Sequence, residues 1–422
     1  MSSRQLKTGY FIVEGLNSFA TVYYLYYLYF FMQSAFGFDN RANLELAALN
    51  GALYTGGSLL GGKFAQRVGY FPALKLGFVM MLAALGAGLG LDSARGQVLV
   101  MAMMVIGMCF TWPTLEAMVS EGETPAGVQH MVGIYNVVWA GTGALAYFTG
   151  GAMLEHLGLK SLFYVPMAVQ LGQLGLTIWL ERRATLGPVN HGVRPSSGAA
   201  SQAKEGVFEK ASAALLDKPA APEDGRTPSS ELNPRPIARA RTFLKMAWLA
   251  NPFAYVAINT LIAVMPGVAS KLGLSTMLAG FCCSLWCFAR LGAFFGLWYW
   301  SGWHYRFLWL LGAFAAMVAA FAVIVLAPNV AVLVLAQIVF GCAIGLIYYS
   351  SLLYSMDLSD TKGEHGGIHE AAIGVGNFAG PAVGAASLHF LPQYASSAAV
   401  AVSLLLLLGL GGLVAIWRRN QP

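Results

Sequence analysis

Charged side chains are scarce in this sequence. Asp, Glu, Lys and Arg make up only 10% of its 422 residues, whereas hydrophobic residues make up 57%. Because a water-soluble domain carries roughly 25% charged residues, this shortage excludes a protein that is solvated over its whole surface. Long apolar runs are abundant instead, and a run of about 20 such residues can cross a bilayer as a helix.

Twelve apolar runs predict an all-α membrane protein with twelve transmembrane helices. Backbone polar groups in lipid must bond internally, which only helices and closed barrels achieve. Runs such as LLLLLGLGGLVAIW (404–417) lack the alternation of a barrel strand, so helices are favoured. The twelve runs lie near residues 10–32, 44–64, 72–91, 97–118, 131–153, 161–180, 244–266, 277–299, 307–327, 330–354, 367–390 and 395–417.

Cysteine is rare, and the usual enzyme motifs are absent. All five cysteines fall inside predicted spans, where a thiol is more often a small packing residue than a disulfide or a metal ligand. The sequence contains no phosphate-binding P-loop, zinc-protease motif or Gly-x-Ser-x-Gly element. We therefore expect neither an enzyme nor an ATP-driven pump, and we expect no cofactor and no metal.

Basic residues are distributed unevenly among the segments that join the spans. If the N-terminus lies in the cytoplasm, 20 of the 25 Lys and Arg residues fall in cytoplasmic segments. The outer loops then hold only Arg41, Arg95, Lys160 and Lys271. This positive-inside bias predicts a multi-pass protein of the plasma (inner) membrane with both termini in the cytoplasm. The net charge of +6 is thus a signal of topology, and we expect no nucleic-acid partner.

Residues 184–240 differ in composition from the rest of the chain. They are rich in Pro, Ser, Gly and Ala and carry charges of both signs, which is typical of a flexible linker. Within them, FEKASAALL (208–216) has the pattern of a short surface helix, although an unstructured linker is favoured. The linker divides the chain into two bundles of six helices, 1–183 and 241–422.

We expect this linker to be dispensable for the fold because of its composition. Limited proteolysis of inside-out vesicles should cut first within residues 184–240 and leave two membrane-embedded halves. Protection of this segment, with cleavage elsewhere, would contradict the expectation.

A constant offset of 234 residues relates the two halves of the sequence. It places Asn17 and Phe19 on Asn251 and Phe253, and it superposes several pairs of glycines without a gap. The offset also places the first predicted span on the seventh and the fifth on the eleventh. This pattern predicts a parallel repeat of two six-helix bundles, and it makes both asparagines candidate solute ligands.

Two segments resemble motifs of the major facilitator superfamily. The segment GKFAQRVGYFPAL (62–74) is similar to that family's signature between spans 2 and 3: Gly62, Arg67 and Gly69 match, and Gln66 stands where Asp is usual. GVGNFAGPAVG (374–384) is similar to the family's Gly-Pro-x-x-Gly element.

The resemblance implies a transporter in which spans 1, 2, 4, 5, 7, 8, 10 and 11 line a central cavity. The two halves would rock about a site at the midplane and expose it alternately to either side. The residues implied to act in gating are Gly62, Gln66, Arg67, Gly69, Gly380 and Pro381.

Polar residues in the first span form a stripe at helical spacing. Glu14, Asn17, Thr21 and Tyr24 recur on one face of the predicted helix. The same span has five tyrosines in seven residues, which cannot all lie at a membrane interface. We therefore expect Tyr24 or Tyr27 to point into a solute pocket, where tyrosine offers an apolar ring and a hydroxyl.

Glu116 lies within TWPTLEA (111–117), which resembles the Pro-x-x-Glu-Ala element of lactose-permease-like sugar/proton symporters. In that group the glutamate belongs to the sugar site, and an arginine on span 5 assists it. Span 5 here offers Asn136 and Trp139 instead, which we also take as candidate solute ligands. An alternative role for Glu116 is a pair with Arg67 in a gate.

Three further ionisable residues lie inside the C-terminal spans: Arg290, His369 and Glu370. Intramembrane charges are costly and are usually paired or face a cavity. We expect His369 and Glu370 to supply the partner of Arg290, and the group to bind an anionic solute or carry a proton. An acid that meets water in one conformation and an apolar wall in another changes its proton affinity between them. Glu370, Glu14 and His369 are accordingly the candidates for proton coupling.

The sequence thus predicts a secondary transporter of a small organic solute, such as a sugar or another polar metabolite, which acts by alternating access as a proton symporter. It is expected to be a monomer in the lipid bilayer. Two alternatives remain open, a drug-efflux antiporter and a non-transporting solute sensor with the same fold.

Overall fold

The computed structural model describes residues 3–123, 125–185, 234–357 and 362–420. Most of the predicted linker, including residues 208–216, lies outside the described residues. The helices are α1 (Ser3–Phe36), α2 (Asn40–Val68), α3 (Tyr70–Gly90), α4 (Ala94–Ser120), α5 (Pro125–His156), α6 (Ser161–Thr185), α8 (Pro234–Lys271), α9 (Thr276–Cys283), α10 (Leu285–Tyr299), α11 (Phe307–Val325), α12 (Val330–Asp357), α13 (Lys362–Phe390) and α14 (Ser397–Arg419).

The all-α prediction is confirmed, because each of the twelve predicted spans is helical and the described residues contain no strand. The eighth span differs in detail, since a break at Ser284 divides it into α9 and α10. The helix α8 begins at Pro234, so residues 234–240 are helical although their composition predicted linker. Proline is tolerated in the first turn of a helix, where its missing N–H has no partner to lose.

Ten segments of the described chain are long and apolar enough to cross a membrane. The helices α1 and α2 do not meet that measure of hydropathy, since α1 is rich in tyrosine and α2 carries several polar residues. Both helices nevertheless lie among the others: α1 packs on α5 and α6, and α2 packs on α4 and α13. Their polar side chains are enclosed by neighbouring helices rather than by lipid.

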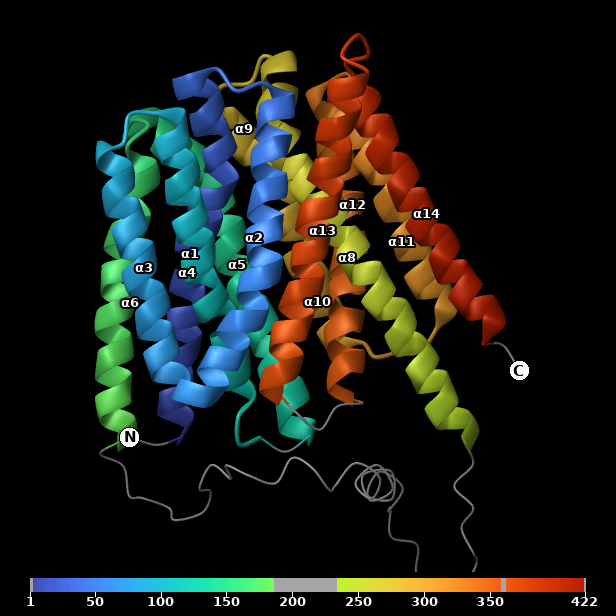
Figure 1. Ribbon diagram of the computed structural model, residues 1–422. Coiled ribbons are helices and arrows are strands. Elements are labelled where there is room, and N and C mark those ends of the chain that lie inside the picture. The colour runs from blue at the N-terminus through green and yellow to red at the C-terminus, as the bar shows by residue number, and fades with distance from the viewer. Residues whose placement is uncertain (1–2, 124, 186–233, 358–361, 421–422) are drawn as a thin grey trace, which may run out of the picture.

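The helices form two bundles that lie side by side, α1–α6 and α8–α14 (Figure 1). These bundles are called the N-terminal half and the C-terminal half below. The start of α1, the end of α6, the start of α8 and the end of α14 all lie on one face of the molecule, called the termini face (Figure 1). The chain therefore crosses the molecule an even number of times.

Large apolar side chains are exposed on many of the helices. Leucines from several different helices each have more than half of their surface exposed, namely Leu60, Leu99, Leu171, Leu308, Leu335, Leu404 and Leu408. Exposed leucines on so many membrane-length helices suit contact with the apolar core of a bilayer. The lateral surface is therefore suited to lipid.

The two halves meet along glycines that allow close backbone approach. A side chain at Gly51 of α2 would collide with the backbone of Asn377 and Phe378 in α13, and one at Gly374 would collide with Thr55. On the other side of the interface, Gly151 of α5 lies against the backbone of α9. Small residues permit such packing in lipid, where helices associate without a hydrophobic driving force. The interface between the halves is therefore tightly closed along α2 and α13.

Candidate functional site

Three carboxyl groups gather in the interior between the halves. Glu14 of α1, Glu116 of α4 and Glu370 of α13 are each at most 6% exposed. They lie close enough for their charges to repel one another. Tyr135 of α5 lies beside Glu14. The sequence predicted these acids separately, and the fold brings them into one cluster, called the acidic cluster here.

A tyrosine ties the acidic cluster across the interface between the halves. The hydroxyl of Tyr54 in α2 donates a hydrogen bond of 2.6 Å to Glu370 Oε2 in α13. Both residues are buried. This contact joins the N-terminal half to the C-terminal half, so a movement that separates α2 from α13 at this depth must break it.

Within the described residues, no cation pairs with the acidic cluster. The ion pairs there include Lys7–Glu123, Lys75–Glu181 and Arg41–Glu45, none of which involves the cluster. Glu116 Oε2 has no hydrogen-bond partner in that part of the chain. Buried carboxylates are costly when charged and unpaired, so the cluster is suited to bind protons or a polar solute.

Arg290 of α10 lies between two indole rings. It is 4% exposed, and its guanidinium carbon is 4.4 Å from the ring centre of Trp139 and 4.8 Å from that of Trp286. Trp139 belongs to α5 in the N-terminal half, whereas Trp286 precedes Arg290 by one turn of α10. Both distances are within the range of a cation–π contact. Arg290 therefore has aromatic neighbours from both halves.

The expected pairing of Arg290 with His369 and Glu370 is not what the structure has. Glu370 accepts its hydrogen bond from Tyr54, and the ring of His369 packs edge-on against Tyr348 at 5.7 Å. No ion pair among the described residues includes Arg290, and its Nε has no hydrogen-bond partner there. Cation–π contacts with two rings replace the ionic contact that the sequence suggested.

Aromatic side chains continue outward from Arg290. The ring centre of Trp139 lies 5.3 Å from that of Tyr348 in α12. Trp286 is stacked against Tyr26 of α1 at 6.2 Å. Tyr255 of α8 lies 6.4 Å from Tyr348. Tyr26 and Tyr255 are only partly buried, unlike Trp139, Trp286 and Tyr348.

The polar residues predicted to form one stripe on α1 have different surroundings in the structure. Asn17 is fully buried, and neither atom of its amide has a partner among the described residues. Thr21 donates to the carbonyl of Asn17 at 2.7 Å within the helix. Tyr24 points toward Phe163 of α6, with ring centres 6.3 Å apart, and so away from the other half. Tyr27 packs on Tyr147 of α5 and bonds its backbone carbonyl.

Two of the remaining predicted ligands bond each other. Trp139 Nε1 donates to Asn136 Oδ1 at 3.0 Å, which fixes the indole beside Arg290. Asn251 is 1% exposed and, like its repeat partner Asn17, has no bond to either amide atom in the described chain. Buried amides normally find partners, so both asparagines remain candidate ligands for a polar solute.

The predicted gating residues occupy varied positions. Gly69 alone connects α2 to α3, with φ of 109°, a conformation that only glycine adopts easily. Gln66 and Arg67 are exposed, whereas Gly62 is buried in α2. A gating role for these four residues stays a prediction.

The other predicted gating residues, Gly380 and Pro381, lie inside α13. A side chain at Gly380 would collide with Val256 of α8, so this glycine sets the distance between two helices of the C-terminal half. Pro381 lacks the N–H for a helical hydrogen bond, which gives α13 a point of weakness beside that contact.

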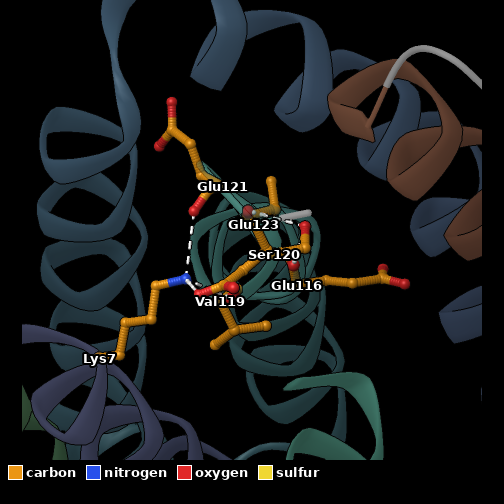
Figure 2. A network of polar contacts seen from close by, with 7 residues as sticks. Lys7, Glu116, Val119, Ser120, Glu121 and Glu123 are labelled. Carbon is orange, nitrogen blue, oxygen red and sulfur yellow. Dashed lines mark hydrogen bonds and ion pairs between the residues drawn. The ribbon is translucent and has the colours of Figure 1, made fainter. Parts of the chain in front are cut away.

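Lys7 lies at the end of α4, a place for which the sequence did not single it out (Figure 2). Its Nζ donates to the carbonyls of Val119 at 3.4 Å and Glu121 at 3.2 Å, and it also pairs with the Glu123 carboxylate. A cation at a helix C-terminus satisfies free carbonyls and opposes the helix dipole. Glu116 extends away from Lys7 (Figure 2), so it belongs to the interior and not to this contact.

Replacement of Lys7 by methionine should destabilise the N-terminal half. Hydrogen bonds to a charged group contribute about 1.5–3 kcal/mol, and the Lys7 side chain is only 14% exposed. The apparent unfolding temperature in detergent should fall by several degrees. Lys63→Met removes an exposed lysine from the termini-face end of α2 and serves as control. Equal unfolding temperatures for Lys7→Met and the parent protein would contradict a capping role.

Several residues at the site were not predicted as ligands: Tyr26, Tyr54, Tyr255, Trp286 and Tyr348. Only Trp286 had a local signal, because it lies four residues before Arg290 and so on the same helix face. The described residues contain no group of His, Cys, Asp and Glu that could hold a metal ion.

Comparison with known proteins identifies the fold. A family model described as Major Facilitator Superfamily matches residues 10–381. No protein with a curated description matches the sequence. The structure is similar to that of the human organic anion transporter MFSD10 (TETRAN), with a TM-score of 0.63 and 15% identity over 98% of this chain and 100% of that chain. It is also similar to a mutant of the peptide transporter POT in complex with sulfate, with a TM-score of 0.69 and 17% identity over 98% of this chain and 94% of that chain. The chain therefore belongs to the Major Facilitator Superfamily and is a multi-pass membrane transporter.

Proposed function

We propose that this chain is a secondary transporter that moves a small organic solute across the membrane by alternating access, together with protons. The observation that carries the proposal is the acidic cluster of Glu14, Glu116 and Glu370. It has no cation partner among the described residues, and it includes acids from both halves. A site shared by the two halves changes its surroundings whenever they move relative to each other.

The contact between Tyr54 and Glu370 suggests how protons and movement are linked. In the closed arrangement Glu370 is buried and held by Tyr54. When the halves separate on one side, Glu370 leaves Tyr54 and meets water, where it exchanges its proton. A proton then favours one arrangement over the other, and the binding of proton and solute is coupled through that equilibrium.

The aromatic surroundings bear on the kind of solute. A sugar, suggested by the motif around Glu116, would need many hydrogen-bond partners. The walls near Arg290 are instead formed by Trp139, Trp286 and Tyr348. A solute with an apolar part fits such walls better. The same lining favours a drug-efflux antiporter as second candidate, in which protons and solute move in opposite directions.

The unequal distribution of Lys and Arg supports an orientation in which the termini face is cytoplasmic and the membrane is the plasma (inner) membrane. The proposed domain division follows the repeat, with one six-helix unit before residue 184 and one after residue 240. We propose that the functional unit is a monomer, because both halves needed for the site belong to one chain.

Uptake into proteoliposomes tests the proposed function. The purified protein is reconstituted and given labelled organic acids, sugars, amino acids and organic cations, with and without an inward pH gradient. Accumulation of one class that requires the gradient and disappears with a protonophore supports proton symport. Expulsion of solute against the gradient supports the antiporter, and binding without any movement supports a sensor.

A further inference from the structure

We propose that the solute is an organic anion with a flat apolar body, and that Arg290 binds its anionic group while the neighbouring indole rings enclose the rest. This inference rests on the proposed transport function and names the substrate class of the same site. The residues that carry it are Arg290, Trp139, Trp286, Tyr26 and Tyr255.

The charge of Arg290 has no counter-charge in the described chain. The guanidinium presents five N–H donors and no acceptor. None of the described ion pairs includes it, and its Nε has no hydrogen-bond partner there. Buried charges are normally paired or hydrogen-bonded. A planar carboxylate from a solute would supply both the missing charge and the acceptors, in the bidentate geometry that arginine favours.

None of the three acids of the cluster forms an ion pair with Arg290 in the described chain. Glu370 accepts from Tyr54, and Glu14 lies beside Tyr135. Glu116 interacts with Glu370 rather than with Arg290. The interior is therefore divided into an acidic region and a cationic region that do not neutralise each other. An acid from outside can reach the arginine without displacing one from the chain.

The walls around Arg290 favour an organic anion over an inorganic one. Indole rings lie on two sides of the guanidinium, at 4.4 Å and 4.8 Å. Tyr26 and Tyr255 stand next to them and are only partly buried. Aromatic faces bind flat apolar groups well and offer little to a small hydrated ion. The solute therefore pairs a carboxylate or similar anionic group with a ring or another flat apolar group.

Contributions from both halves give the site a way to enclose its solute. Trp139 belongs to the N-terminal half, and Trp286 and Arg290 belong to the C-terminal half. When the halves separate, Arg290 loses one of its two aromatic neighbours and becomes accessible. When they close, the indole of Trp139 returns and covers the bound anion.

Binding of simple aromatic acids to the purified protein tests this inference. The probes are benzoate, 1-naphthoate and 4-phenylbutyrate, each compared with its neutral amide, and phenethylamine as a cation. Quenching of tryptophan fluorescence and the apparent unfolding temperature report binding. We expect saturable binding of the acids and at least about tenfold weaker binding of the amides, since about 1.4 kcal/mol separates affinities tenfold.

Variants of Arg290 test whether the aromatic acids bind at this residue. Arg290→Gln should weaken binding of the acids by about tenfold or more, and Arg290→Lys should retain part of it because the charge remains. Arg95→Gln removes an exposed arginine of α4 and is the matched control. If Arg290→Gln does not fold, Arg290→Lys and the contrast between acids and amides decide the question.

The outcomes separate this inference from the proposed function. Equal affinity for amides and acids, unchanged binding in Arg290→Gln, or no saturable binding of any acid would each overturn the inference. Proton-driven accumulation of a neutral solute could still be observed in that case, and the proposed function would stand. Conversely, Arg290-dependent binding of acids without proton-driven accumulation of any solute would overturn the proposed function and leave the anion site intact.

Discussion

Replacement of Glu370 by glutamine should abolish the accumulation of solute that a pH gradient drives, while solute exchange at equal pH on both sides stays largely intact. Glutamine has nearly the same shape as glutamate and can still bond Tyr54, but it cannot take up and release a proton. Glu370 is the acid whose partner belongs to the opposite half. Its exposure therefore changes most directly when the halves move.

The expected size of this effect is complete loss of gradient-driven accumulation, to the level of vesicles without protein. Exchange of labelled for unlabelled solute at equal pH measures the carrier without its proton step. Glu45→Gln is the matched control, since Glu45 is an exposed acid of α2 that pairs with Arg41. Full gradient-driven accumulation in both Glu370→Gln and Glu14→Gln would mean that protons are not coupled through these acids. A uniporter or a sodium-coupled carrier would then be the better interpretation.

A side chain larger than hydrogen at Gly51 should prevent the two halves from closing. The position faces the backbone of Asn377 and Phe378 in α13, and backbone cannot turn aside as a flexible side chain can. Overpacking typically costs about 1–3 kcal/mol, which corresponds to a loss of about 5–150-fold in the population of the closed arrangement. Gly51→Ala should therefore reduce transport several-fold, and Gly51→Val should reduce it to background.

The same helix supplies the control for this prediction. Gly56 of α2 is exposed, and an added side chain there meets no atom nearby. Gly56→Ala should leave transport unchanged. The Gly51 and Gly56 variants should all unfold at temperatures near that of the parent protein, because the packing within the N-terminal half is untouched. Normal transport by Gly51→Val would show that the contact between α2 and α13 is not needed in the transport cycle.

The sequence was sufficient to predict the helices and the family fold. A membrane helix follows from a local run of apolar residues, so each of the twelve spans could be found without knowledge of its neighbours. The constant offset that relates Asn17 to Asn251 indicated an internal repeat. The ionisable residues of the site were also recognised, since a charge inside an apolar run is conspicuous.

The partners of those residues could not be predicted, because they are set by packing between distant helices. Tyr54 and Glu370 are 316 positions apart, and Lys7 and Glu123 are 116 apart. No local pattern relates such residues. Arg290 was expected to meet an acid, and it lies instead between indole rings, one of which comes from the other half. Pairs within one helix, such as Asn136 and Trp139, follow from helical spacing and can be predicted from the sequence.

Distances measured across the interface on both faces test alternating access most directly. Spin labels at His130 and Tyr299 report on α5 and α10 near the termini face, and labels at Leu157 and Leu278 report on the end of α5 and on α9 at the opposite face; all four side chains are exposed. The pairs would be placed in a variant whose five cysteines have been replaced, and pulsed electron paramagnetic resonance would be recorded at several pH values. Our account predicts that acidification and solute shift the two distances in opposite senses, one lengthening as the other shortens. Two distances that lengthen together, or that do not respond to pH or solute, would contradict it.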